Sequence, residues 1–129
     1  MEPVRRRNLL KEIEMLHLVY VLKPTTKARR DMKAFWNWLS EREAWFYGGL
    51  DMAVDPRWYV RTIGQDVHSL EHSISFEDEA AWGAYRSAVS ARSHDPAWEQ
   101  RRVEQDDWWE ILEARLLNDA PVRRTTSAA

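Results

Sequence analysis

Three histidines stand among apolar residues and are the side chains of this sequence best suited to acid-base chemistry: His17, His68 and His72. An unperturbed imidazole titrates near neutral pH, so it can both accept and donate a proton under ordinary conditions. His17 lies in the segment MLHLVYVL, and the other two lie in HSLEHSISF. This pattern is compatible with an acid-base pair, with a metal or haem ligand set, and with buried histidines that only support the core.

The string HSLEH fits the inverse zinc-protease pattern, but its surroundings argue against a shared metal ion. That chemistry needs a helix, on which residues four apart are neighbours. The segment alternates instead, with His68, Leu70, His72, Ile74 and Phe76 on one face. A strand would separate His68 from His72 by about 13 Å, whereas zinc-to-nitrogen bonds measure about 2 Å. We therefore predict no metal site.

Periodicity and turn residues predict the elements that position these histidines. The predicted strands are residues 15–22, 58–63, 68–76 and 108–117. The predicted helices run from about Thr26 to about Glu41, from an Asp78 cap through Val89, and from Asp95 and Pro96 through Val103. Residues 45–54 have no clear state. Residues 15–117 are expected to form one domain, between an N-terminal arm (1–14) and a flexible tail (118–129).

Composition excludes several function classes. The 129 residues carry 19 Lys and Arg against 21 Asp and Glu, so the chain lacks the positive charge that nucleic-acid binding needs. No apolar run is long enough for a membrane span or a signal peptide, which predicts a cytoplasmic protein with no membrane partner. The absence of cysteine excludes thiolate chemistry, and no Gly-rich phosphate motif supports a nucleotide, flavin or other cofactor. Eight Trp predict aromatic cores or pockets.

The order strand, helix, strand, strand, helix, strand predicts an α+β, ferredoxin-like β-α-β-β-α-β fold, an antiparallel sheet with helices on one face. Three segments, MLHLVYVLKP, SISFEDEAAWGAY and SHDPAW, extend this pattern over residues 15–117. With them the chain resembles the dimeric α+β barrel superfamily, which includes antibiotic-biosynthesis monooxygenases, NIPSNAP-type proteins and polyketide cyclases of the olivetolic acid cyclase type.

The resemblance implies a homodimer in which each subunit keeps an apolar cavity between sheet and helices. It places His17 at the position of the cavity-facing histidine of the cyclases, and it turns the face of His68 and His72 toward the same cavity. We therefore predict that His17 and His72 act together as base and acid, with His68 assisting. The residues expected to hold the substrate are Val19, Trp36, Leu70, Ile74 and Trp82.

Three functions follow from this interpretation. The first is a small natural-product tailoring enzyme that encloses an apolar organic substrate and catalyses cofactor-free cyclisation, isomerisation or dehydration. The second is a cofactor-independent monooxygenase of the antibiotic-biosynthesis type. The third is a non-catalytic dimeric ligand-binding protein. Fold resemblance alone does not choose among them, because one fold serves many reactions.

Overall fold

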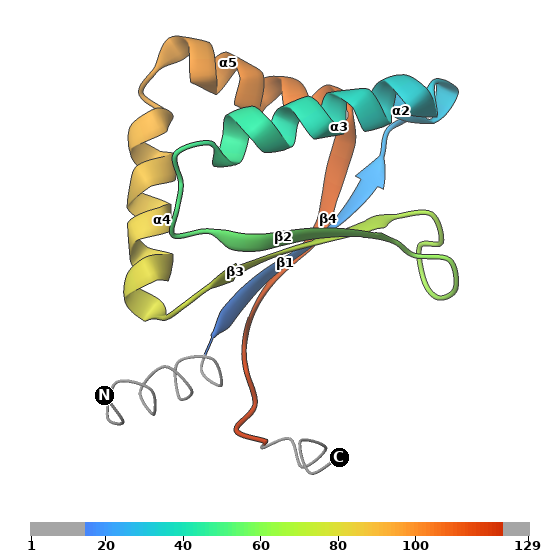
Figure 1. Cartoon of the computed structure of the whole chain (residues 1–129). Helices are drawn as coiled ribbons and strands as arrows, with labels where there is room; N and C mark the ends of the chain where they lie inside the picture. The colour runs from blue at the N-terminus through green and yellow to red at the C-terminus, as the bar shows by residue number, and fades with distance from the viewer. Residues whose placement is uncertain (1–14, 123–129) are drawn as a thin grey trace.

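The computed structural model describes residues 15–122 and shows one antiparallel sheet with its helices gathered on one side (Figure 1). The strands are β1 (Leu16–Pro24), β2 (Val54–Val60), β3 (Leu70–Phe76) and β4 (Trp109–Asn118). Their order in the sheet is β2-β3-β1-β4, with every neighbouring pair antiparallel. The predicted ferredoxin-like α+β fold is confirmed. The predicted arm at residues 1–14 and the tail beyond residue 122 lie outside the described residues.

The helices begin where short polar side chains can cap them. They are α2 (Thr26–Arg30), α3 (Met32–Tyr47), α4 (Glu79–Arg92) and α5 (Pro96–Glu104), followed by the 3-10 turn η1 (Gln105–Asp107). Asp78 and Asp95 cap α4 and α5 as predicted, each accepting a hydrogen bond from a backbone N–H of the first turn. The single helix predicted to end near Glu41 is instead two, because extended Asp31 interrupts it and caps α3, which continues to Tyr47.

Two strands begin elsewhere than predicted. β2 starts at Val54 rather than Trp58, and an irregularity in its pairing lies between Val54 and Arg57. β3 starts at Leu70, so His68 is not part of it. His68 has a φ of 74° and belongs to the turn before the strand. Its expected place on the same strand face as Leu70 is therefore wrong, because the alternation of a strand cannot continue through a left-handed residue.

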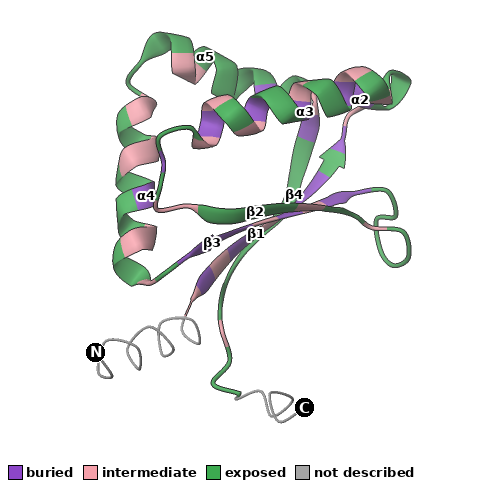
Figure 2. Cartoon of the chain, in the orientation of Figure 1, coloured by how far each residue is buried: buried purple, intermediate pink, exposed green. Residues whose placement is uncertain are grey.

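The two faces of the sheet have different surroundings. Residues paired across antiparallel strands share a face, so Leu18 with Ile74 and Tyr20 with His72 lie on one side. This side meets the helices and holds the buried core of β1 and β3 (Figure 2). His17 pairs with Ser75 and therefore lies on the opposite, open face. Within residues 15–122, no helix is both long enough and apolar enough to cross a membrane.

Candidate functional site

A cavity of about 560 Å³ lies between the helix-facing side of the sheet and helices α3, α4 and α5. Its walls are mainly apolar and aromatic, which suits an organic ligand of moderate size. The principal wall residues are Leu18, Leu22, Phe46, Trp82, Val89 and Trp109. Polar groups from β3, the C-terminal half of α3 and η1 converge on it, namely His72, Arg42, Tyr47 and Gln105, and α4 and α5 add the charged side chains of Arg86, Glu99 and Arg102 to its wall.

His72 is held in one tautomer. Its ring is 1% exposed, its Nδ1 lies 2.9 Å from the backbone oxygen of Arg57, and its Nε2 lies 2.6 Å from the Tyr47 hydroxyl. A carbonyl oxygen only accepts, so Nδ1 carries the proton, and Nε2 accepts from the hydroxyl. Burial lowers the pKa of His72 to about 4, with Arg42 acting in the same direction, against the bond to the Arg57 carbonyl. The imidazole is thus a neutral acceptor at pH 7.

Trp58 fixes the plane of that imidazole. The two rings stack with centroids 3.6 Å apart and planes 10° from parallel, because Trp58 and His72 are direct partners on β2 and β3. The indole N–H donates to a carboxylate oxygen of Glu43 on α3 at 2.7 Å. The His72 ring is therefore held at its edge by its two hydrogen bonds and on its face by Trp58.

Tyr47 completes an acid-base pair with His72. Burial raises the pKa of the Tyr47 hydroxyl, and the nearby Arg42 guanidinium opposes that rise. At neutral pH the phenol keeps its proton and points it at His72 Nε2. The Tyr47 oxygen can take a proton from a ligand while the hydroxyl gives its own proton to His72 Nε2 in the same step. This geometry supports proton transfer inside an apolar chamber.

Arg42 is a buried cation beside this pair. It is 6% exposed and lies on the buried stripe of α3 with Phe35, Leu39 and Phe46. Its Nε donates to the side-chain oxygen of Gln105 at 2.7 Å. The guanidinium lies 4.0 Å from the Phe46 ring centroid and just over 5 Å from those of Tyr47 and Trp109. Among residues 15–122, its Nη1 has no hydrogen-bond partner.

Solved structures with this architecture cover most of the chain. A NIPSNAP family protein of unknown function from Agrobacterium tumefaciens matches at 16% identity and a TM-score of 0.60, over 84% of this chain and 90% of its own. An uncharacterized NIPSNAP-like domain protein from Burkholderia xenovorans matches at 13% identity and a TM-score of 0.51, over 85% of this chain and 87% of its own. A "putative antibiotic biosynthesis monooxygenase" from Bacteroides thetaiotaomicron matches at 11% identity and a TM-score of 0.50, over 89% of this chain and 95% of its own.

The chain shares the ferredoxin-like α+β fold of these structures. This confirms the superfamily resemblance at the level of structure, since identities this low carry the fold and no more. No protein-family model matches the sequence, and no curated protein matches it.

Only part of the predicted site comes together in this α+β fold. His72 and Trp82 line the cavity. Leu70 and Ile74 share the face of His72 but are packed in the core beside it. The remaining predicted residues lie elsewhere: His17 and Val19 on the open face of the sheet, His68 in an exposed turn and Trp36 on the exposed side of α3.

The predicted pairing of His17 with His72 is wrong, because the two side chains leave the sheet on opposite faces. Sequence reasoning also missed Tyr47 and Arg42, which lie beyond the predicted end of the helix at Glu41. The signal was present. The buried spacing Phe35, Leu39 continues through Arg42 to Phe46 with helical periodicity. Within residues 15–122, no three His, Asp or Glu side chains gather into a group that could hold a metal ion.

His17 instead joins the start of β1 to the end of β4. Its Nε2 lies 2.6 Å from a carboxylate oxygen of Asp119 and its Nδ1 lies 2.7 Å from the Ser75 hydroxyl. Because a carboxylate only accepts, Nε2 donates to Asp119, while Nδ1 and the Ser75 hydroxyl are hydrogen-bonded to each other. The backbone N–H of Asp119 also donates to Met15. This arrangement is a structural clamp on the open face.

Replacing Asp119 with alanine removes the acceptor of His17 Nε2 and should therefore lower the free energy of unfolding by about 1 kcal/mol, the usual contribution of one hydrogen bond. Urea unfolding followed by tryptophan fluorescence measures it. Glu110→Ala in β4 is the control, because that side chain is exposed. Equal unfolding midpoints for the two variants would contradict the clamp.

Proposed function

We propose that the chain is a small enzyme that performs cofactor-free acid-base chemistry, such as cyclisation, isomerisation or dehydration, on an apolar organic molecule held in the cavity. The observation that carries this proposal is the buried hydrogen bond between Tyr47 and His72, which lies in the cavity wall. A neutral imidazole behind a cavity-facing phenol can receive a proton without first losing one. Natural-product tailoring is the biosynthetic setting we propose.

A simple carbon acid tests this proposal without knowledge of the natural substrate. The probe is 2-tetralone, an apolar bicyclic ketone whose C–H beside the carbonyl exchanges with solvent through its enolate. In deuterated buffer, proton NMR should show exchange faster with the protein than with buffer alone or with an equal concentration of free imidazole and phenol. An exchange rate equal to that of the free side chains would contradict the proposal and favour a binding protein.

A cofactor-independent monooxygenase is the second candidate. It is favoured by the likeness to the structure from Bacteroides thetaiotaomicron, a protein that is named after this activity. Deprotonation of a phenol by the same pair would create the electron-rich anion that reacts with oxygen. An oxygen electrode distinguishes the two functions. Oxygen uptake in the presence of 1-naphthol that requires the protein and is lost in Tyr47→Phe would favour the monooxygenase over the isomerase or cyclase.

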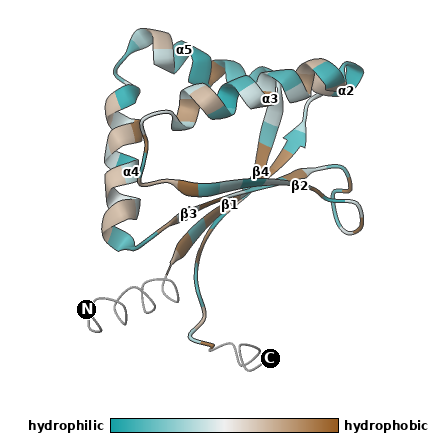
Figure 3. Cartoon of the chain, in the orientation of Figure 1, coloured by the Kyte–Doolittle hydropathy of each residue, from teal (hydrophilic) through white to brown (hydrophobic). Residues whose placement is uncertain are grey.

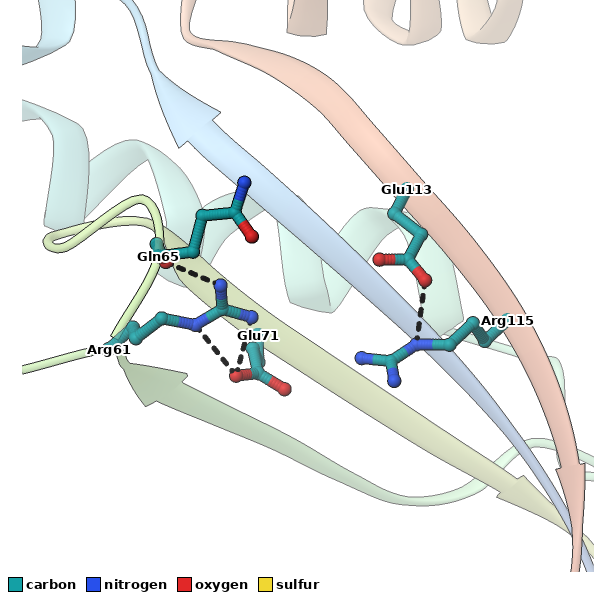
Figure 4. Close-up of polar contacts among 5 residues, drawn as sticks. All are labelled: Arg61, Gln65, Glu71, Glu113 and Arg115. Carbon is teal, nitrogen blue, oxygen red and sulfur yellow. Dashed lines mark hydrogen bonds and ion pairs between the residues drawn. The ribbon is translucent and has the colours of Figure 1, made fainter. Parts of the chain in front are cut away.

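The proposed enzyme is a homodimer that uses the open sheet face and the β4 edge. Figures 2 and 3 show that β4 is mostly exposed although stretches of it are hydrophobic. Ile111, Leu112, Leu116 and Leu117 are 57%, 38%, 43% and 44% exposed. The open face is only partly apolar. The pairs Arg61 with Glu71 and Arg115 with Glu113 lie across it (Figure 4). Such a mixed surface is typical of interfaces.

Leu117 pairs with His17 and therefore lies on the open face. Leu117→Arg should convert a dimer into a monomer at micromolar concentration, because a charge replaces an apolar contact at the proposed interface. Light scattering coupled to gel filtration measures the mass. Val103→Arg, on the exposed side of α5, should leave the mass unchanged. A monomeric wild-type protein would contradict the proposal.

A further inference from the structure

The charge of Arg42 has no counter-ion in the described structure. No carboxylate among residues 15–122 lies within ion-pair distance of its guanidinium. Its Nε donates to the side chain of Gln105, and the guanidinium is also a hydrogen-bond partner of the Tyr47 hydroxyl, and both of these groups are neutral. The side chain is nevertheless 94% removed from solvent, since only 6% of it is exposed. A cation has thus been buried with neutral neighbours only.

Burying an ion without a partner is costly, and the neighbours of Arg42 offset only part of that cost. The faces of Phe46, Tyr47 and Trp109 attract the cation through their ring electrons. They do not supply a hydrogen-bond acceptor to Nη1, which remains unpartnered. Arg42 lines the cavity, and a buried guanidinium with an unpartnered nitrogen in a cavity-lining residue is the arrangement expected where an anionic ligand provides the missing acceptor.

We infer that the cavity binds an apolar or aromatic carboxylic acid, whose carboxylate accepts hydrogen bonds from the Arg42 guanidinium. A planar guanidinium matches a carboxylate in shape and charge, and one buried cation balances one negative charge. The sheet side of the wall and its α3 and α4 flanks carry Leu18, Leu22, Phe46, Trp82, Val89 and Trp109, so the body of the ligand is a hydrocarbon or an aromatic ring, while Arg86, Glu99 and Arg102 line another part of the wall. This inference names the substrate class of the proposed enzyme and rests on that proposal for its catalytic meaning.

A carboxylate in this position would also assist the acid-base pair. The Arg42 guanidinium lies 5.3 Å from the Tyr47 ring, so a ligand anchored at Arg42 reaches the Tyr47 hydroxyl with its adjacent carbon atoms. Its negative charge would offset the repulsion that Arg42 exerts on a protonated His72. Binding of the correct ligand would thus make it easier for His72 to accept a proton. A neutral ligand would not.

Binding of two matched probes tests the anion site. The probes are 2-naphthoate and 2-naphthamide, which share shape and aromatic area and differ in charge. Isothermal titration calorimetry at pH 7 should show that the full chain binds naphthoate about 10- to 100-fold more tightly, the range for a hydrogen-bonded buried charge. Arg42→Gln should lose this preference while its affinity for naphthamide stays the same.

Arg30→Gln, on the exposed surface of α2, is the control and should keep the wild-type preference. If Arg42→Gln does not fold, Arg42→Lys tests the same point, because a lysine retains the charge without the planar fork and should lower the preference. Equal affinities of the wild type for the two probes, no binding of either, or an unchanged preference in Arg42→Gln would overturn the inference. These readouts need no turnover, so they fail or succeed independently of the deuterium-exchange test.

Discussion

Tyr47→Phe should slow protein-catalysed deuterium exchange of 2-tetralone by about 10²- to 10⁴-fold, the usual contribution of a positioned acid-base group. The substitution keeps the ring that packs beside Phe46 and removes only the hydroxyl that touches both His72 and the cavity. Proton NMR in deuterated buffer measures the exchange rate. The variant also leaves Nε2 of a buried imidazole without its donor, so we expect a loss of about 1 to 3 kcal/mol of stability.

His72→Gln tests the same unit from the other side. Without the imidazole, the Tyr47 hydroxyl has no basic acceptor, and exchange should fall by a similar factor. The double variant should lose little more than either single one, because two groups that pass one proton act together. Tyr59→Phe is the matched control, since this hydroxyl lies on the exposed part of β2. Additive losses, or full exchange activity in folded Tyr47→Phe, would contradict the pair.

The local signals of this sequence predicted the elements well. Asp78 and Asp95 marked the starts of α4 and α5 because an N-cap acts within its own helical turn. Alternation predicted a strand over residues 68–76, and Leu70–Phe76 forms one because one of its faces is buried continuously. What these signals could not show was where the backbone leaves regular geometry. Asp66 and His68 both have positive φ, and neither residue type requires it.

The candidate site depended on information that alternation does not contain. Alternation separates the two faces of β1, but both carry apolar residues, with Leu18 and Leu22 on one side and Val19 and Val21 on the other. Which side meets the helices is decided by packing of the whole domain. His17 was therefore assigned to the wrong face. Arg42 was missed for a related reason, since an arginine on an apolar helical stripe resembles an exposed residue until its neighbours are known.

The wild-type protein should lose about 3 kcal/mol of stability through His72 alone as the pH falls from 7.5 to 4. In the unfolded chain the imidazole has its ordinary pKa of 6.5, whereas in the folded protein burial lowers that pKa to about 4. Above pH 6.5 the imidazole is neutral in both states and has no effect. Below it the unfolded state binds the proton first, so stability falls until pH 4, at about 1.4 kcal/mol for each pKa unit.

Urea unfolding at pH 7.5 and pH 4.5 measures this loss, most of which is already present at the lower pH. His72→Gln removes the titrating group, so its stability should fall by about 2 to 3 kcal/mol less than that of the wild type over the same interval. Protonation of carboxylates lowers the stability of both proteins and cancels in the comparison. His94→Gln, in the exposed turn between α4 and α5, should keep the wild-type dependence. Parallel stability curves for the wild type and His72→Gln would mean that His72 is not held neutral by burial, and it could not then receive the Tyr47 proton at pH 7 as proposed.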